Sequence, residues 1–444
     1  MNLLKNINLV QYLEQTRLEN NTRINNEKRI EELGESKGKT IFSIIFVGFL
    51  TLLTITAVTL LHSNQQEFIL DRFVGISKFE FSLFDSTVYV AYFLTGIVIS
   101  VLSGKLAKRK IFIVIGSIGA ALFFYLMTLT VNYFLLLFLR FLQGCFSIIV
   151  WQTLMTIVLD LSTPNDRGRN MGIFGILLAL GMGSGPFLGG FIADVGVFIP
   201  YYVASGLMIL VLFLSLFLKE PTSLKGGVTV KESLNILKSD PKIIVPSLFN
   251  FIDRLHMGFI IFALPLIIGL DTSEGGLALE PRFRGMAFGI FALPYILLQY
   301  PFGKLSDKIG RYPQLLIGSI CYGIVLSFVG YFGGESFGVL LTILVFLGLF
   351  SGVTSPPSMA LVGDSLNDTK KNSAAMGIFT LLGNIGIALG PVIAGSMLQL
   401  GFGLTFLVAG IIEVFFLIVN IILIRFVFKE KLFRKNDLKP TLLL

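Results

Sequence analysis

Ionisable side chains lie inside the most apolar stretches of this 444-residue chain. Arg140, Asp253 and Glu413 have long hydrophobic runs on both sides, in a sequence that is 54% hydrophobic and 14% charged. A charge at the centre of a bilayer costs about 2.5–3.5 kcal/mol even on lenient scales, so such a residue faces protein or a water-filled cavity. We take Asp253 and Glu413 as candidates for binding or relaying a coupling ion. Arg140 is a candidate functional residue of the interior, and a structural hydrogen-bonding role is the alternative.

Polar residues repeat at helical spacing around two of these candidates. Gln143, Ser147 and Trp151 follow Arg140 at intervals that place all four on one face of a helix. In the predicted span at 243–267, Asp253 shares one side of the helix with Asn250, Arg254 and Met257. Asp253 is either a protonatable carboxylate or a permanent partner of the adjacent arginine. The candidate cavity residues are therefore Gln143, Ser147, Trp151, Asn250, Arg254 and Met257.

The remaining buried ionisable groups leave several interpretations open. Glu413 could face inward, stay protonated against lipid or couple protons. His256 is either a packed residue or a proton carrier. We expect the acids at the predicted span ends to cap helices or to form latches, and these are Asp85, Asp160, Asp194 and Asp364.

Apolar runs of about 20 residues, the length that crosses the hydrocarbon core, define the elements that must position these groups. The sequence predicts an all-α membrane protein of twelve transmembrane helices, with no β-barrel pattern. The expected spans are residues 41–61, 84–103, 111–130, 133–155, 170–193, 198–218, 243–267, 285–303, 314–332, 337–361, 374–398 and 402–427.

The distribution of positive charge predicts the orientation of these spans. With both ends on one side, 29 of the 35 Lys and Arg residues fall on that side. Because loops rich in Lys and Arg stay in the cytoplasm, we expect a multi-pass protein of the cell membrane with both termini cytoplasmic. The net charge of +8 is thus a feature of topology in a lipid bilayer, and we expect no nucleic-acid partner.

An internal repeat divides the chain into two like-oriented halves. GKLAKRKIFIVIGS at 104–117 matches GKLSDKIGRYPQLLIGS at 303–319, and the stretches at 171–190 and 376–395 also match. A six-span unit repeated in tandem keeps its orientation and predicts two pseudo-symmetric six-helix bundles. The expected segments are a tail at 1–40, bundles at 41–218 and 243–428, a cytoplasmic loop at 219–242 and a tail at 429–444.

The motifs in these repeats resemble those of the major facilitator superfamily, over residues ~40 to ~428. Its loop motif is matched by Gly303, Asp307, Lys308, Gly310 and Arg311, and its span-4 motif by Arg140, Gln143 and Gly144. The resemblance assigns Arg140 to ion coupling or to the substrate path. The span-5 motif of the drug/proton antiporter branch is matched by Gly172, Gly181, Gly185, Pro186, Gly189 and Gly190.

The resemblance implies a cytoplasmic latch built by Asp307, Lys308 and Arg311. The first copy keeps Gly104 but has Lys108 in place of the acidic residue, and a cation cannot replace an anion at a helix N-terminus. We therefore expect an asymmetric latch, retained in the second half and mostly lost in the first. The alternative for the basic residues near Lys108 is a topology anchor.

The glycines of spans 5 and 11 are expected to shape the contact between the halves. Gly181, Gly185 and Gly189 form one face without side chains, beside the helix-bending Pro186. Span 11 repeats this groove with Gly386, Gly390 and Pro391. The resemblance places both grooves where the halves rock against each other, and plain small-residue packing is the alternative.

These features predict a secondary transporter that works by alternating access, and not an enzyme. The favoured task is proton-coupled efflux of a small, partly apolar organic solute or drug. The alternatives are uptake or facilitated diffusion of a metabolite, and a transport-inactive sensor or scaffold on the same fold. We expect a monomer without metal or cofactor, whose partners are the solute, protons or another coupling ion, and lipid.

Overall fold

The computed structural model describes residues 40–105, 108–162, 166–218, 230–366 and 372–432. Every regular element in these ranges is a helix. Eleven of the helices are long and apolar enough to cross a membrane, and one more apolar helix, Ile199–Ser215, is shorter. The expectation of an all-α membrane protein is confirmed, and each of the twelve expected spans corresponds to a helix.

The first half contains six of these spanning helices and one short helix between the first two spans. Its first span, Thr40–Ser63, ends in the 3-10 turn η1 (Leu60–Ser63). The other elements are α2 (Gln65–Ile69), α3 (Lys78–Lys105), α4 (Arg109–Leu129), α5 (Tyr133–Leu161), α6 (Arg167–Ala193) and α7 (Ile199–Ser215).

The second half begins with an amphipathic connecting helix, α8 (Val230–Ser239), and the turn η2 (Pro241–Ile243). Thr229 and Glu232 have the spacing of a capping box in the sequence, but Thr229 lies outside the described residues. The spanning helices and their flanking turns are α9 (Ile244–Gly269), η3 (Thr272–Glu274), α10 (Pro281–Ile309), α11 (Arg311–Phe332), α12 (Phe337–Asp364), α13 (Asn372–Met397), η5 (Leu398–Leu400), α14 (Phe402–Ile422) and η6 (Leu423–Val427).

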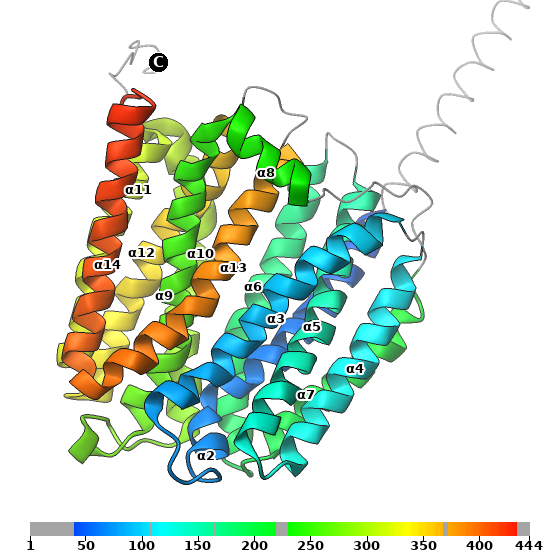
Figure 1. Ribbon diagram of the computed structural model, residues 1–444, viewed down its shortest axis with the longest axis vertical. Coiled ribbons are helices and arrows are strands. Elements are labelled where there is room, and N and C mark those ends of the chain that lie inside the picture. The colour runs from blue at the N-terminus through cyan, green and yellow to red at the C-terminus, as the bar shows by residue number, and fades with distance from the viewer. Residues whose placement is uncertain (1–39, 106–107, 163–165, 219–229, 367–371, 433–444) are drawn as a thin grey trace, which may run out of the picture.

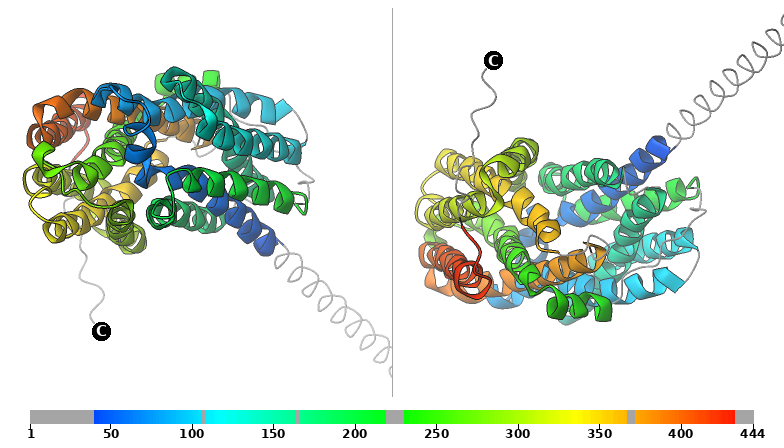
Figure 2. Two further views of the ribbon diagram at one scale, coloured as in Figure 1. Left: turned by 90° about the horizontal axis from the view of Figure 1, so that it is seen from below. Right: turned by 90° about the horizontal axis from the view of Figure 1, so that it is seen from above.

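The helices pack as two bundles that stand side by side (Figure 1). Within the first bundle α4 packs on α5 and α7, and within the second α9 packs on α13 while α10 packs on α12. Two helix pairs join the bundles, α3 with α13 and α6 with α10. Figure 2 shows the two bundles along the helix axes from both ends.

We call the two ends of the bundle the basic face and the opposite face. The basic face is the end where the first span begins at Thr40 and where α14 ends, beside α8 (Figure 1). The opposite face carries α2 and the loop from Leu270 to Glu280. It holds few of the basic residues, as the sequence analysis expected.

The outside of the bundle is apolar along the whole length of its helices. On α4 the exposed residues are all large and hydrophobic at helical spacing, namely Ile111, Ile115, Ile118, Leu122, Tyr125 and Leu129. A contiguous apolar surface of this kind is not stable in water and is stable against lipid. The lipid bilayer is therefore the surrounding that this surface fits.

Two helices differ in length from the sequence expectation, and the difference moves functional residues. α3 begins at Lys78 instead of residue 84, and α10 covers residues 281–309 instead of 285–303. Polar residues at helix ends continue the backbone hydrogen bonding without adding to an apolar run, so a hydropathy pattern misses them. Asp85 consequently lies two turns inside α3, and the loop motif forms the last turns of α10.

Candidate functional site

A chain of side-chain hydrogen bonds runs along α5. Arg140 Nη1 donates to Gln143 Oε1 at 2.7 Å, and Gln143 Nε2 donates to Ser147 Oγ at 2.7 Å. All three side chains are buried. Positions three and four apart lie on one side of a helix, so the spacing in the sequence positions them directly.

The charge of Arg140 has no ion-pair partner in the described part of the chain. Its side chain is 0% exposed, and the Nε and Nη2 atoms reach no acceptor there. Its Cζ atom lies 4.7 Å from the centroid of the Phe84 ring, a cation–π contact that is worth about 2 kcal/mol when desolvated. A buried charge without a counter-ion is costly. Arg140 is therefore held in an electrostatically unfavourable position.

Trp151 does not extend this chain of hydrogen bonds. Its indole N–H finds no acceptor among the described residues, and its side chain is half-buried. The structure thus joins Arg140, Gln143 and Ser147 but leaves Trp151 separate.

Asp85 lies in the interior of the first half, next to one of the two histidines of the chain. Gln65 Nε2 donates to Asp85 Oδ1 at 2.7 Å and lies 3.0 Å from His62 Nδ1. His62 Nδ1 is 3.5 Å from the same Asp85 oxygen, and all three side chains are buried. The expectation that Asp85 caps a helix or forms a latch was wrong, because α3 begins earlier than the apolar run indicated.

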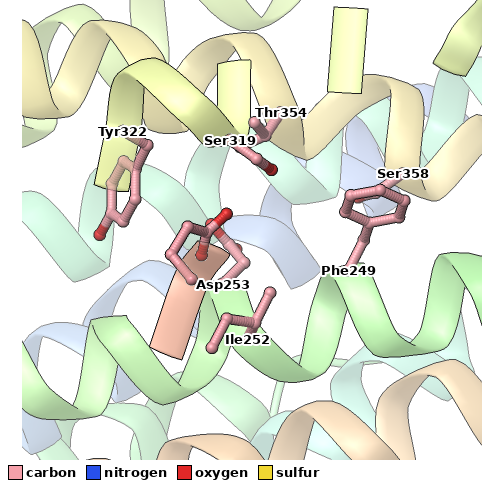
Figure 3. A pocket seen from close by; sticks show the side chains of 8 residues that line it. Phe249, Ile252, Asp253, Ser319, Tyr322, Thr354 and Ser358 are labelled. Atoms are coloured by element: carbon pink, nitrogen blue, oxygen red, sulfur yellow. The ribbon is translucent and has the colours of Figure 1, made fainter. Parts of the chain in front are cut away.

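A small cavity in the second half brings together the two carboxylates proposed from the sequence. Its free volume is about 10 Å³, close to the room that one water molecule needs. Side chains from α9, α11 and α12 converge on it, as Figure 3 shows. The lining residues are Phe249, Ile252, Asp253, Ser319, Tyr322, Thr354, Ser358 and Glu413.

Glu413 faces the interior of the bundle and pairs with the second histidine. The Oε2 atom of Glu413 lies 3.2 Å from His256 Nδ1, although without the alignment of a full hydrogen bond. His256 Nε2 lies 3.0 Å from the carbonyl oxygen of Ala409, and its ring stacks on Tyr322 at 5.5 Å between centroids. Of the interpretations considered for Glu413, the structure shows a side chain that faces the interior and not lipid.

Asp253 and Arg254 do not form the permanent ion pair considered as an alternative. Ser351 Oγ lies 3.5 Å from Asp253 Oδ1. The Arg254 side chain is half-buried and forms no hydrogen bond or ion pair within the described ranges. Adjacent residues on a helix point about 100° apart, which separates the carboxylate from the guanidinium.

Two further candidates from α9 point away from the cavity. Asn250 Nδ2 donates to the carbonyl oxygen of Phe379 at 2.7 Å, so this side chain ties α9 to α13. Met257 is partly buried and packs against the apolar core. Neither residue lines this small cavity, since helical spacing gives a common side of the helix but not the neighbour that this side meets.

The loop motif of the second half forms ion pairs within that half. Arg311 Nη1 lies 2.5 Å from Asp307 Oδ1, and Arg311 Nε lies 3.0 Å from Asp364 Oδ2. Gly310 has φ of +97° and separates α10 from α11, which explains the requirement for glycine. Gly303 lies in α10 with only Pro356 near, and Lys308 is exposed in the last turn. Among the described residues, the ion pair that Asp307 forms is with Arg311 of its own half.

The first copy of the loop motif retains more than the sequence analysis expected. Arg109 Nε lies 3.1 Å from Asp160 Oδ2, and both side chains are 1% exposed. Arg109 begins α4 as Arg311 begins α11, and Asp160 ends α5 as Asp364 ends α12. Arg109 thus forms the same kind of ion pair in the first half as Arg311 forms in the second. Gly104 lies in the last turn of α3.

The glycine face of α6 packs inside its own half. A Cβ atom at Gly181 would lie 2.9 Å from the carbonyl oxygen of Leu52, and Cβ atoms at Gly185 and Gly189 would collide with Thr59 and Leu60. Gly386 and Gly390 likewise face α9, and Pro391 contacts Gly258 there. The expectation that these two glycine faces form the contact between halves was wrong. Beyond its own helix backbone, a Cβ atom at Gly172 would have no described residue within 4 Å.

Gly190, which belongs to the same expected set of interface glycines, does lie between the halves, one position further along α6. A Cβ atom at Gly190 would lie 2.6 Å from the carbonyl oxygen of Pro281 and 3.1 Å from Gly285 Cα in α10. A Cβ atom at Gly395, the equivalent residue of the second repeat, would lie 2.5 Å from Ser82 in α3. Both contacts are near the opposite face, where α6 meets α10 and α13 meets α3.

Replacing Gly190 with leucine is expected to separate the bundles at the opposite face without unfolding the first half. The new side chain would meet the α10 backbone, which cannot yield as a side chain can. Spin labels on Val131→Cys and Leu400→Cys, two exposed positions at this face, would report a longer distance. Gly172→Leu in the same helix is the control and should leave the distance unchanged.

Three ion pairs also connect the halves at the opposite face. Arg284 Nη1 lies 2.6 Å from Glu67 Oε2 and also donates to the Ser63 carbonyl oxygen at 3.2 Å. Lys78 and Glu274 are 2.8 Å apart, and Arg282 and Asp194 are 4.0 Å apart. On the basic face the ion pairs among described residues stay within each half. The structure is therefore closed at the opposite face.

Two helical bundles with buried polar groups in their interior are typical of membrane transporters, and comparison with known proteins shows the family of this chain. A sequence model of the Major Facilitator Superfamily matches residues 40–269 and 246–441. The chain belongs to this superfamily, which confirms the resemblance seen in its motifs. Membership also supports the expectation that it is not an enzyme.

The chain is similar to proteins named as MFS-type transporters and to proteins named for multidrug resistance. An MFS-type transporter of Methanocaldococcus jannaschii is 27% identical over 374 residues, covering 81% of this chain and 91% of the relative. Multidrug resistance protein 2 of Bacillus subtilis is 28% identical over 337 residues, covering 74% and 80%. The crystal structure of the nucleoside transporter NupG has a TM-score of 0.71 at 11% identity, covering 86% and 99%, and shows the fold alone.

Proposed function

We propose that this transporter exports a small, partly apolar organic solute in exchange for protons. The observation that carries this proposal is the group around the second-half cavity, where Asp253 and Glu413 approach one water-sized space and Glu413 pairs with His256. Buried carboxylates inside a membrane bundle mark ion pathways more often than they contribute to stability. The similarity to a multidrug resistance protein supports export of a lipophilic compound.

The His256 ring fixes how a proton would be held. A carbonyl oxygen can only accept a hydrogen bond, so His256 Nε2 carries a hydrogen toward Ala409. His256 Nδ1 and Glu413 Oε2 then need one proton between them, because otherwise two lone pairs would face each other. The pair holds this proton either as a neutral acid beside an imidazole or as a carboxylate beside an imidazolium.

The cavity gives this proton a path toward Asp253. A carboxylate, the Tyr322 hydroxyl and a water of the size that the cavity admits form a set of donors and acceptors that can relay a proton. We assign Glu413 and His256 to proton storage and Asp253 to exchange with the space between the halves. Arg140 lies in the other half. We assign it an electrostatic role, in which its positive charge acts together with the protonation state of Asp253 and Glu413.

The distribution of basic residues supports placing the basic face in the cytoplasm of the cell. The opposite face, with its three ion pairs between halves, then faces outward and is closed in this state. Solute would enter from the cytoplasmic side. In this proposal the pairs Arg311–Asp307 and Arg109–Asp160 would form contacts between the halves once the bundles rock and the basic face closes.

A carrier for an organic anion is the second candidate function, and the two arginines favour it. Arg140 and Arg254 both lack ion-pair partners among the described residues, whereas the acids of the second half have neighbours. A carboxylate or phosphate of a metabolite would supply the missing counter-charge. This candidate requires neither proton coupling nor export.

Proteoliposomes with an imposed pH gradient distinguish the two functions. Solute accumulation that follows the gradient, and collapses when a protonophore is added, supports proton-coupled export. Flux of an anionic metabolite that ignores the gradient supports the second candidate and would overturn the first. Fluorescent lipophilic cations and small carboxylates are the two probe panels.

Asp253→Asn is expected to uncouple the protein in this assay. An amide keeps the size of the side chain and its contact with Ser351 but cannot release a proton. Gradient-driven accumulation should fall about tenfold or more, while exchange of solute across vesicles without a gradient persists. Asp271→Asn, an exposed acid at the opposite face, is the matched control. Equal accumulation in both variants would remove Asp253 from the proton path.

A further inference from the structure

The segment from Leu60 to Ile69 carries two features that the proposed proton path does not use. His62 and Gln65 face Asp85 inside the first half, and Glu67 reaches across to Arg284 of the second half. Ser63 belongs to both sets, because its hydroxyl donates to the Pro186 carbonyl oxygen and its own carbonyl accepts from Arg284. A buried histidine therefore lies on the same short segment as the ion pair that closes the opposite face.

The hydrogen bonds around His62 define its protonation in this closed state. Gln65 Nε2 is a donor, and it lies 3.0 Å from His62 Nδ1 and 2.7 Å from Asp85 Oδ1. His62 Nδ1 must therefore accept, which leaves this nitrogen without a proton. One amide group thus occupies both the nitrogen that a proton would take and the carboxylate that would pair with it.

We propose that His62 and Asp85 form a second proton-binding site, in the first half, whose occupation opens the opposite face. A proton on His62 Nδ1 cannot coexist with a donating amide, so Gln65 has to leave. His62 then pairs directly with Asp85, only 3.5 Å away. This inference rests on the alternating-access function proposed above but not on the identity of the solute.

Displacement of Gln65 acts on the closed face through the next two residues. Gln66 Nε2 donates to the Gly269 carbonyl oxygen of the second half at 3.1 Å, and Glu67 holds Arg284. Gln65, Gln66 and Glu67 are consecutive residues of the five-residue helix α2, so we expect a rearrangement of Gln65 to shift its two neighbours as well. Proton binding and closure at this face therefore oppose each other, and by linkage the proton binds more tightly when the face is open.

Other charged groups near this site need separate control. Asp85 lies within electrostatic range of Tyr89, Tyr133 and Tyr201, and Arg140 lies near the first and last of these. From α10, Phe288 is the ring that faces His62, at 6.5 Å between centroids. Beyond α2, burial and the neighbouring Glu67 raise the pKa of Asp71, against the opposing effect of Arg284. Asp71 and Glu67 are thus the competing titratable groups.

The test measures the opposite face directly, in the full chain in lipid nanodiscs and without solute. The cysteine background is Cys145→Ser with Cys321→Ser, both of which are free thiols in the structure. Spin labels at Val131→Cys and Leu400→Cys report the separation of the halves. We expect the open fraction to rise about tenfold between about pH 8 and about pH 5.5, the range in which histidine titrates.

Three variants determine whether His62 is the responsible group. His62→Gln is expected to abolish the pH response and hold the face closed, since it cannot take up a proton. Asp85→Asn should shift the response to lower pH, because the protonated histidine loses its counter-ion. Asp71→Asn is the control and should leave the response intact. A full response in His62→Gln, or its loss in Asp71→Asn, would overturn the proposal.

A fourth variant keeps the test decisive where His62→Gln fails to fold. Gln65→Met removes the amide while retaining His62, Asp85 and the side-chain volume. The proposal expects a raised open fraction already near neutral pH, about threefold or more, because the proton no longer competes with a donor. An unchanged open fraction would contradict it. Since no transport is measured, a proton-independent transporter could still satisfy this proposal, and a coupled exporter could still fail it.

Discussion

Replacing Glu413 with glutamine is expected to abolish uphill transport while preserving downhill exchange. The glutamine amide can donate to the nearby His256 Nδ1 but releases no proton. One coupled proton in a gradient of about 2 pH units sustains a solute ratio of about 100-fold, because each unit is worth 1.36 kcal/mol. The variant should reach a ratio of about 1, with counterflow rates within about threefold of the unmodified protein.

Two further variants separate a coupling role for Glu413 from a structural one. Glu430→Gln is the matched control, because Glu430 pairs with Lys242 at 2.6 Å on the basic face, far from the cavity. It should accumulate solute normally. His256→Asn removes the bond to Ala409 and should likewise uncouple transport. If Glu413→Gln lost counterflow and accumulation together, it would have damaged the fold and the assignment to proton storage would fall.

The fold was predictable because lipid imposes a simple rule on the sequence. Every backbone polar group in the hydrocarbon has to be bonded within its own helix, so apolar runs near 20 residues map onto spans with few alternatives. The repeat then gave the two bundles. Helix ends were less predictable, as α3 and α10 show, since their terminal turns contain charged residues that no longer contact lipid.

The candidate site was predictable only where its residues lie on one helix. The Arg140–Gln143–Ser147 chain follows from spacing along α5. The pairs His62–Asp85 and His256–Glu413 join residues 23 and 157 positions apart, and no local pattern signals such contacts. A usable signal did exist, because the chain has only two histidines and both lie in or beside apolar runs. A rare ionisable residue in that setting requires a partner.

The glycine motifs show how a correct pattern can be assigned to the wrong neighbour. A face without side chains at Gly181, Gly185 and Gly189 predicts close approach of some helix, and the first span is the one that approaches. The contact between the halves requires close approach of two helix backbones only in the state that is closed at this face. Near the closed face that close approach involves Gly190 against α10, Gly285 against α6, and Gly395 against α3.

Replacing Arg140 with methionine is expected to stabilise the protein and abolish its transport. The guanidinium is fully buried without a counter-ion among the described residues, so a neutral side chain of similar length removes an electrostatic cost of about 2 kcal/mol or more. The melting temperature in nanodiscs should rise by about 2 °C or more.

Arg284→Met is the matched control, because that buried arginine has a partner in Glu67, and its loss should lower the melting temperature. Residues that fold against their own electrostatic preference persist because another state of the cycle uses the charge. A lower melting temperature in Arg140→Met would show that Arg140 serves structure, and it would end its candidacy for ion coupling.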